Sequence, residues 1–250
     1  MRAALYLRSI VPNDYFQFQQ FRIDQSDCAQ KVSTDACILG AAADLSNASR
    51  VLDLGTGTGL LALMAAQRAP AAAIEAIEID AAAAAQAAAN AAASPWSGRI
   101  QVHALSLAAY AATQPGLFSH IICNPPFFRR SLASPDAARA TARHEGPDSL
   151  TFGNIIDFAG AHLALGGTLT VLLPPPEMQQ FEQEAQAGGL PVQARLVVQH
   201  RPGGRATRGI STFGRGAPAS IRADSLVIQA ADGTYSAGFR ALLAGFYLAW

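Results

Sequence analysis

The sequence has little cysteine, little lysine and no long apolar runs. The three cysteines, Cys28, Cys37 and Cys123, form no C-x-x-C pair and leave an odd number. This argues against a disulfide framework or a structural zinc site and fits a reducing, cytoplasmic compartment. Lys31 is the single lysine beside 17 arginines, and alanine supplies 53 of the 250 residues. Both biases are typical of GC-rich coding sequences, so neither indicates a function.

No stretch of 18 strongly apolar residues is present, and Arg8 and Pro12 interrupt the apolar N-terminus before a signal sequence could form. We therefore expect neither a membrane span nor an export signal. The 18 basic residues balance the 18 acidic ones, and half of the chain is hydrophobic. These values exclude a strongly disordered chain and a protein that is basic overall. We expect one domain over residues 1–250, with residues 1–45 as an N-terminal extension.

Strand-like and helical segments alternate from Arg50 onward, which predicts an α/β fold with a mostly parallel, seven-stranded sheet and helices on both faces. The seven predicted strands are 50–54, 73–79, 100–104, 118–123, 168–173, 192–199 and 224–229. The predicted helices are 35–43 with Thr34 as N-cap, 59–69, 81–93, 106–112, 150–165, a segment from Pro174–Pro176 to about 187, and 239–250. A further strand is expected over 15–23, and Gly166-Gly167 is expected to end the 150–165 helix.

A glycine-rich segment, Asp53-Leu54-Gly55-Thr56-Gly57-Thr58-Gly59, follows the first of these strands and opens a helix. Glycines at such a turn let backbone N–H groups approach a ligand closely. Glu78 ends the next strand, where a carboxylate can accept hydrogen bonds from both ribose hydroxyls. These features fit a nicotinamide dinucleotide or S-adenosylmethionine. Asp53 would oppose a diphosphate and suits a cationic methionine moiety, although it could also simply bond amides of the turn.

Asn124-Pro125-Pro126-Phe127 stands directly after the fourth strand. Two prolines make a stiff turn and remove two backbone donors. The Asn124 side-chain oxygen and the Pro125 carbonyl can accept both hydrogens of a planar amine, which directs the nitrogen lone pair at a methyl donor. Phe127 would stack on the group that carries the amine. We interpret Asn124, Pro125, Pro126 and Phe127 as the catalytic segment.

The order DLGTGTG, IEID and NPPF resembles the class I, Rossmann-like S-adenosylmethionine-dependent methyltransferases that act on exocyclic or amide nitrogens. Four further segments, 21–42, 93–103, 143–145 and 232–248, resemble the family of bacterial tRNA1(Val) (adenine(37)-N6)-methyltransferases. The resemblance runs from about Phe16 to Leu248. It implies transfer of a methyl group from S-adenosylmethionine to N6 of adenosine 37 in a tRNA substrate.

The resemblance also implies site residues. The cofactor would be bound by Lys31, Thr34, Asp35, Asp53, Gly55, Gly57, Gly59, Glu78, Ser106 and Asn124, with the N-terminal extension packed beside it. Ser106 stands where many relatives have aspartate, and a hydroxyl can make only a weaker contact with the cofactor adenine. Phe127 replaces the tyrosine of many relatives and keeps the stacking face.

Arginines gather in two segments. Six lie between Arg195 and Arg222 with no acid among them, and four follow NPPF. Those expected to contact RNA phosphates are Arg129, Arg130, Arg143, Arg201, Arg205 and Arg208. An ordinary solvated loop is the competing interpretation. The histidines show no metal spacing, so we expect no metal.

Other readings remain open from the sequence. One alternative is a release-factor glutamine methyltransferase, which has a similar NPPY motif but usually carries a separate N-terminal domain. Another is an rRNA guanine-N2 methyltransferase with a duplicated fold, which is longer than this sequence. A catalytically idle RNA-binding scaffold and a nicotinamide dehydrogenase are the alternatives from other classes. The sequence does not decide whether the protein is a monomer or a weak dimer.

Overall fold

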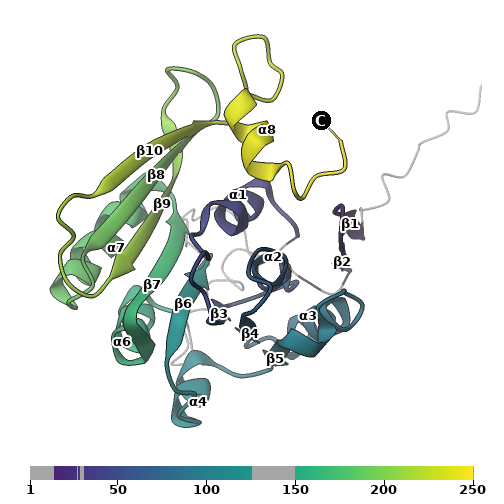
Figure 1. Cartoon of the computed structure of the whole chain (residues 1–250), viewed down its shortest axis with the longest axis vertical. Coiled ribbons are helices and arrows are strands. Elements are labelled where there is room, and N and C mark those ends of the chain that lie inside the picture. Colours follow the sequence, from purple (N-terminus) through teal and green to yellow (C-terminus); the bar gives the residue numbers. More distant parts are fainter. Residues whose placement is uncertain (1–13, 27, 29–30, 126–149, 250) are drawn as a thin grey trace, which may run out of the picture.

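The computed structural model describes residues 14–26, 28, 31–125 and 150–249. Its centre is an eight-stranded sheet of order β10-β8-β9-β7-β6-β3-β4-β5 (Figure 1). The strands are β3 (Arg50–Leu54), β4 (Ala73–Ile77), β5 (Ile100–His103), β6 (Phe118–Cys123), β7 (Leu163–Leu173), β8 (Val192–Gln199), β9 (Ala206–Gly214) and β10 (Arg222–Val227). All neighbours pair in parallel except β9, which is antiparallel to both β7 and β8. The predicted α/β class with a mostly parallel sheet is confirmed.

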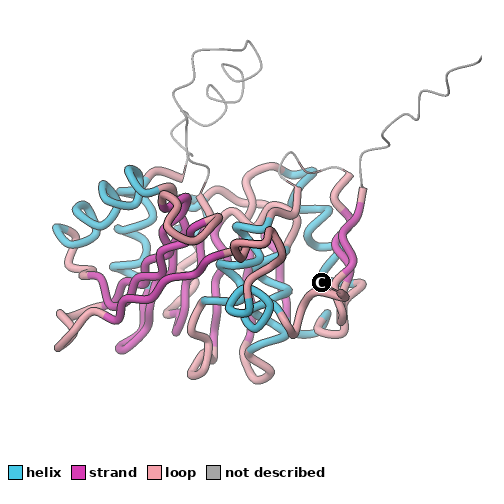
Figure 2. The backbone as a smooth tube through the Cα atoms, turned by 90° about the horizontal axis from the view of Figure 1, so that it is seen from above, coloured by secondary structure: helices cyan, strands magenta, loops and turns pink. Residues whose placement is uncertain are grey.

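Helices cover both faces of the sheet. One apolar cluster joins the sheet to α1 (Thr34–Ala42), α2 (Leu60–Arg68) and α8 (Ala237–Leu243), and α3 (Ala81–Ala92) packs on β5 beside them. A second cluster joins the opposite face to α4 (Leu107–Ala112), α6 (Phe152–His162) and α7 (Pro175–Ala187). A short 3₁₀ turn, η1 (Ser97–Arg99), leads into β5. Figure 2 shows the sheet enclosed between these helical layers.

A separate two-stranded hairpin, β1 (Tyr15–Gln17) and β2 (Arg22–Asp24), lies beside α3 at the end of the molecule opposite β10 (Figures 1 and 2). Phe18 and Phe21 of its turn are buried and stacked, with ring centroids 4.5 Å apart. The sequence predicts one strand over 15–23, but the chain reverses here because the two aromatic rings leave solvent together. The Gln19 N–H donates to the Phe246 carbonyl, so the C-terminal segment closes over the hairpin.

Three other predictions need correction. The sheet has eight strands because β9 occupies the Gly- and Arg-rich segment interpreted as a loop; its buried positions Ile210 and Phe213 pair with β7 and β8. Helix α6 ends at His162, and Gly166-Gly167 lie within β7. Gly166 has a φ of 75°, and the β6–β7 register shifts there, so the glycines permit an irregular strand and do not end a helix. Helix α8 is shorter than predicted and ends at Leu243.

The parallel pairing gives the sheet two unlike edges. The chain enters β3, β4, β6 and β7 at the amino edge and leaves at the carboxyl edge, and α1, which precedes β3, begins at the carboxyl edge. Strand β8 runs parallel to β7, because both are antiparallel to β9. The β8–β9 turn therefore also lies at the carboxyl edge, where open α/β sheets bind their ligands.

The N-cap of α1 is Ser33, not Thr34, because the Ser33 hydroxyl accepts the Ala36 N–H at 3.2 Å. We expect Ser33→Ala to lower the free energy of unfolding by about 1 kcal/mol, since that N–H loses its partner. Ser33→Asp should retain wild-type stability, because its carboxylate can make the same bond. Chemical denaturation measures both variants, and an unchanged midpoint for Ser33→Ala would contradict the assigned cap.

Candidate active site

Three of the predicted segments meet at the carboxyl edge of adjacent strands. Leu54 of β3 pairs with Ile77 of β4 on one side and with Cys123 of β6 on the other. The residues that follow these three positions are Gly55, Glu78 and Asn124. Strand register alone therefore places the glycine loop between the acid and the Asn-Pro segment.

The glycine loop, residues 53–59, requires glycine at three positions because of its backbone conformation. Gly55, Gly57 and Gly59 have φ values of 70°, 56° and 84°, in the left-handed region that side chains disfavour. A Cβ on Gly59 would also lie 3.4 Å from the backbone of Ala87, so α3 packs tightly against the loop. The N–H groups of Gly55 and Thr56 donate to the Ile77 carbonyl, which holds the loop against the end of β4.

Asp53 is completely buried beneath this loop. Its Oδ2 accepts hydrogen bonds from the Thr56 hydroxyl (2.5 Å) and the Ala62 N–H (3.1 Å), so the side chain does order the turn. Its Oδ1 is buried and has no partner among the described residues. Burial raises the pKa of Asp53 to about 7 against the two hydrogen bonds that lower it, and the nearby Glu78 raises it further. One lone carboxylate oxygen is thus left for a group that the protein itself does not supply.

Glu78 is half-buried at the end of β4 and faces the loop. Its Oε2 accepts the Gly57 N–H at 2.9 Å, and its Oε1 accepts the Asp80 N–H at 3.0 Å. Asp80 caps α3 by accepting the N–H groups of Ala82 and Ala83. The carboxylate of Glu78 is therefore fixed in direction and remains at the carboxyl edge.

Asn124 and Pro125 follow β6, and Pro125 is buried. The Asn124 Oδ1 is buried with no partner in the described part of the chain, so it is a second lone acceptor oxygen at this edge. Cys123 just before it donates its thiol to the Leu54 carbonyl, and burial raises the pKa of that thiol well above its usual range. The other predicted residues of this region lie outside the described residues: Pro126, Phe127, Arg129, Arg130 and Arg143.

The start of α1 carries the other predicted donor-site residues. Thr34 is held by the Tyr247 hydroxyl, which also bonds the Cys37 thiol. Asp35 forms an ion pair with Arg208 of β9, with Nε and Oδ2 2.8 Å apart. Lys31 is exposed, and its Nζ is 4.0 Å from the Asp14 carboxylate. The structure brings Thr34 and Asp35 to the carboxyl edge, but the Asp35 charge already has a protein partner.

Ser106 begins α4 just after β5 and serves as its N-cap, accepting the Ala109 N–H at 3.2 Å. The carbonyl of His103, at the end of β5, accepts the Glu78 N–H. Ser106 therefore lies near the same edge, with its hydroxyl oxygen occupied by the helix.

The six arginines from 195 to 222 separate into two groups. Arg195, Arg215 and Arg222 lie toward the amino edge; Arg195 pairs with Glu182, and Arg215 donates to the Gly160 carbonyl. Arg201, Arg205 and Arg208 lie at or beside the β8–β9 turn at the carboxyl edge. Of these, Arg201 and Arg205 are exposed, and their side chains make no ion pair or hydrogen bond with the described residues.

The sequence reasoning missed three residues that support the site: Gln25, Asn90 and Tyr247. The buried Gln25 side chain accepts the Val32 N–H, and Asn90 of α3 bonds the glycine loop. The signal for Asn90 was available, because it is one of only two polar residues in the alanine-rich α3. No local sequence pattern indicated Tyr247, because the partners of its hydroxyl, Thr34 and Cys37, are more than 200 residues away.

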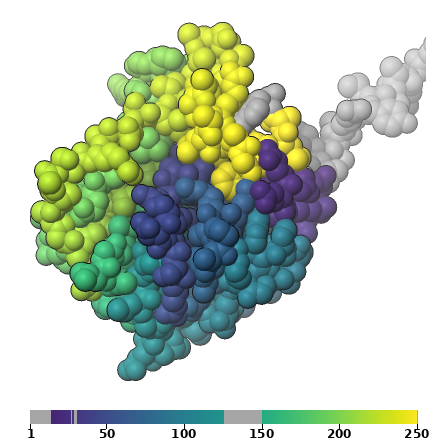
Figure 3. Space-filling model, in the orientation of Figure 1, coloured from purple at the N-terminus to yellow at the C-terminus, as the bar shows by residue number. Residues whose placement is uncertain are grey.

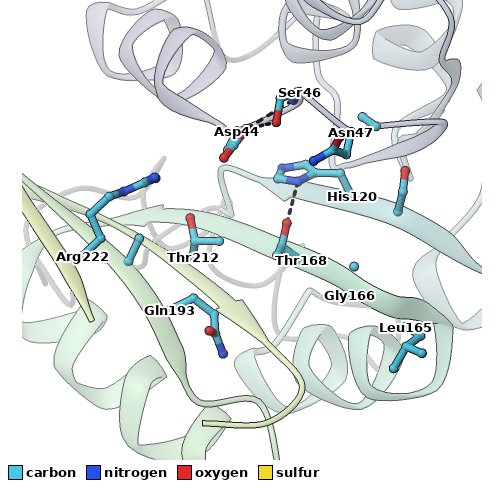
Figure 4. Close-up of a pocket in the computed structure, with 14 residues that line it drawn as sticks. Asp44, Ser46, Asn47, His120, Leu165, Gly166, Thr168, Gln193, Thr212 and Arg222 are labelled. Atoms are coloured by element: carbon cyan, nitrogen blue, oxygen red, sulfur yellow. Dashed lines mark hydrogen bonds between the residues drawn. The ribbon is translucent and has the colours of Figure 1, made fainter. Parts of the chain in front are cut away.

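An open pocket of about 370 Å³ lies at the opposite, amino edge (Figure 4). His120 lines it, with Nδ1 2.9 Å from the Thr168 hydroxyl and a buried Nε2 that has no partner among the described residues. Burial lowers the pKa of His120 to about 4. Asp44, Thr212 and Arg222 face the same space. The pocket is separated from the glycine loop by the length of the strands and is not part of the candidate site.

Within the described ranges, no helix is long and apolar enough to cross a membrane, and no three histidine, cysteine, aspartate or glutamate side chains gather as metal ligands. The described cysteines are all buried and unpaired with one another.

A glycine loop, an acid on the next strand and an Asn-Pro turn at one edge of this sheet define a Rossmann-like methyltransferase. The model of the methyltransferase small domain family matches residues 28–174. The protein named tRNA1(Val) (adenine(37)-N6)-methyltransferase in Pseudoalteromonas translucida is 41% identical over 93% of this chain and 98% of its own. The protein of the same name in Bacteroides thetaiotaomicron is 40% identical over 94% and 98%.

Solved structures agree on the fold. A predicted O-methyltransferase from Agrobacterium tumefaciens superposes with a TM-score of 0.65 over 85% of this chain and 96% of its own, at 23% identity. A ribosomal protein L11 methylase from Lactobacillus delbrueckii gives 0.54 over 78% and 84%, at 18% identity. The chain belongs to the methyltransferase small domain family, among relatives that carry the name tRNA1(Val) (adenine(37)-N6)-methyltransferase.

The raised pKa of Asp53 has a measurable consequence for stability. Its carboxyl group titrates near 3.8 in the unfolded chain and near 7 in the folded one, so between these pH values the folded state binds more protons. Stability relative to an Asp53→Asn variant should therefore fall by about 1.4 kcal/mol per pH unit from about pH 4 to 7 and stay level above. Denaturant unfolding of both proteins across this range measures it, and a pH-independent difference would contradict the raised pKa.

Proposed function

We propose that this protein transfers a methyl group from S-adenosylmethionine to N6 of adenosine 37 in tRNA1(Val). The assignment of this substrate is supported by the names of the two relatives described above, which align with more than nine-tenths of this chain. The observation that carries the chemistry is the buried, unpartnered Oδ1 of Asn124, followed by Pro125 at the carboxyl edge. An acceptor oxygen without a donor costs folding free energy, and an incoming amine would recover it.

The residues present fit S-adenosylmethionine. The Asp53 Oδ1 is a buried lone acceptor at the glycine loop, suited to a cationic methionine moiety. The Glu78 carboxylate is oriented by the Gly57 and Asp80 N–H groups and would accept the ribose hydroxyls. Thr34, Asp35 and Lys31 would border the methionine end of the cofactor, and Ser106 would border its adenine. The N-terminal extension, residues 1–45, would pack beside the cofactor. When bound, S-adenosylmethionine supplies an electrophilic methyl group.

Asn124 and Pro125 would position the nucleophile. The Asn124 Oδ1 and the Pro125 carbonyl would accept the two hydrogens of the adenine amine, which fixes the plane of that group and directs its lone pair, perpendicular to that plane, at the methyl group of the donor. Partial positive charge would grow on the nitrogen as the new N–C bond forms and the sulfur–methyl bond of the donor breaks, and both oxygens would stabilise it. The nitrogen would lose its proton to water after the bond has formed, so no general base is needed. Phe127 would stack on the base.

Arg201 and Arg205 would bind the tRNA backbone. Both are exposed, their side chains lack partners among the described residues, and they lie on the turn that the β7–β9–β8 pairing brings to the carboxyl edge. Arg208 would contribute while paired with Asp35, and Arg129, Arg130 and Arg143 after NPPF would complete the surface. A base in an anticodon loop is already partly unstacked, so its extrusion into the site costs little.

Asn124→Ala should remove methyl transfer and keep cofactor binding, because the side chain acts on the acceptor amine. We expect kcat with tRNA to fall at least about 100-fold, and the affinity for S-adenosylhomocysteine to stay near wild type. Asn47→Ala, at the amino-edge pocket, is the matched control and should leave turnover unchanged. Tritium transfer to tRNA and calorimetry measure the two quantities; wild-type turnover of Asn124→Ala would contradict the mechanism.

The double variant Arg201→Ala, Arg205→Ala should weaken tRNA binding and flatten its salt dependence by about 1 to 2 units of slope, since two phosphate contacts are lost. The control Arg215→Ala, Arg222→Ala removes the same charge at the amino edge and should leave the slope unchanged. Binding is measured at several salt concentrations, and equal slopes for the two double variants would exclude the β8–β9 turn from the RNA surface.

The substrate is tested by nucleoside mass spectrometry of individual tRNAs from a strain that lacks the gene. Loss of N6-methyladenosine at position 37 of tRNA1(Val), restored by the wild-type gene, is the expected result. Loss of methylated glutamine in a release factor or of N2-methylguanosine in rRNA, with tRNA unchanged, would instead support a different amino substrate.

A further inference from the structure

Asn90 connects three parts of the chain that are distant in sequence. Its Nδ2 donates to the Thr58 carbonyl of the glycine loop at 2.9 Å and to the Asp24 carbonyl at 2.8 Å. Its Oδ1 accepts the Asp24 N–H at 2.9 Å. The side chain is 3% exposed, so water cannot replace these partners without opening the structure.

The three bonds require a carboxamide. Two backbone carbonyls and one N–H converge on this side chain, and only an amide offers two donors and an acceptor in that arrangement. Aspartate would place a charged oxygen against two carbonyl oxygens. Alanine, which fills most of α3 and favours the helix more, would leave the buried Thr58 carbonyl and the half-buried N–H and carbonyl of Asp24 without this partner.

The network continues from Asn90 to the start of α1. Asp24 is followed by Gln25, whose buried Oε1 accepts the Val32 N–H at 2.8 Å, next to the Ser33 cap. Figure 3 shows the hairpin packed closely against α3 and the C-terminal segment. The glycine loop is thus held on one side by Glu78 at Gly57 and on the other by Asn90 at Thr58.

We propose that Asn90 is a positioning residue of the donor site, which locks the glycine loop and the N-terminal hairpin in the arrangement that binds S-adenosylmethionine. This role rests on the proposed function, because it presumes that the loop holds the donor. Asn90 does not touch the reacting atoms in this account. Its loss should therefore raise the KM for S-adenosylmethionine and leave kcat at saturating donor nearly unchanged.

The test compares Asn90→Ala and Asn90→Asp with Ala85→Gly, an exposed position of the same helix. Ala85→Gly weakens α3 without contact to the loop or the hairpin. Calorimetry with S-adenosylhomocysteine well below each Tm should show about tenfold or greater loss of affinity for both Asn90 variants and none for Ala85→Gly. Hydrogen exchange without ligand should rise together in residues 55–59, 22–26 and 31–33 for the Asn90 variants only.

Two results would overturn the inference in distinguishable ways. Wild-type affinity and exchange in both Asn90 variants, with only a lower Tm, would make Asn90 a structural residue and leave the proposed function intact. Failure of the wild-type protein to bind S-adenosylhomocysteine would contradict the donor site itself, and the role of Asn90 with it.

Discussion

The parallel alignment of β4, β3 and β6 is the constraint on which the site depends. Leu54 pairs with both Ile77 and Cys123, so the three strands end at the same level of the carboxyl edge. The next residues are a left-handed glycine, a glutamate and an asparagine, and none of them could meet without that register. A slip of one residue would turn the side chains of a strand to its other face and remove the apolar contacts of both clusters. The hydrophobic core therefore determines the geometry of the site.

Within that frame, the site contains polar atoms that folding leaves unsatisfied. The described residues give no partner to Asp53 Oδ1 or Asn124 Oδ1, although both are buried. Such groups lower the free energy of unfolding. The raised pKa of Asp53 has the same cause, because burial without enough hydrogen-bond donors disfavours the charged carboxylate. Their position beside the glycine loop and after β6 is what a site for a cationic donor and an amine acceptor requires. Stability is lower here than an apolar replacement would give, and under the proposed function the two oxygens would bind ligands.

The arrangement of charge explains how a chain with no net charge can serve a polyanionic substrate. Glu182 and Asp35 neutralise Arg195 and Arg208, whereas the described residues leave Arg201 and Arg205 unpaired on a turn at the carboxyl edge. The same edge holds Asn124 and the glycine loop. Positive charge is therefore available where the proposed tRNA acceptor would bind. The net charge is zero because acidic residues elsewhere in the chain equal the basic ones in number. The amino edge has its own open pocket around His120 but shares no residue with the site.

The sequence by itself determined the α/β class, most of the strands and helices, and the place of the glycine loop and of the Asn-Pro turn after their strands; the catalytic role of that turn stays a prediction. These follow from local signals: apolar periodicity, glycines after a strand, and residues that cap helices. Tertiary structure decided the rest. It made β9 from a segment rich in Gly and Arg by pairing it with β7 and β8, and it folded 15–24 into a hairpin through Phe18 and Phe21. It also determined which arginine side chains between 195 and 222 have protein partners among the described residues. It also brought Asn90, Thr58 and Asp24 together, because hydrogen bonds between residues 32 and 66 positions apart exist only once the chain has folded.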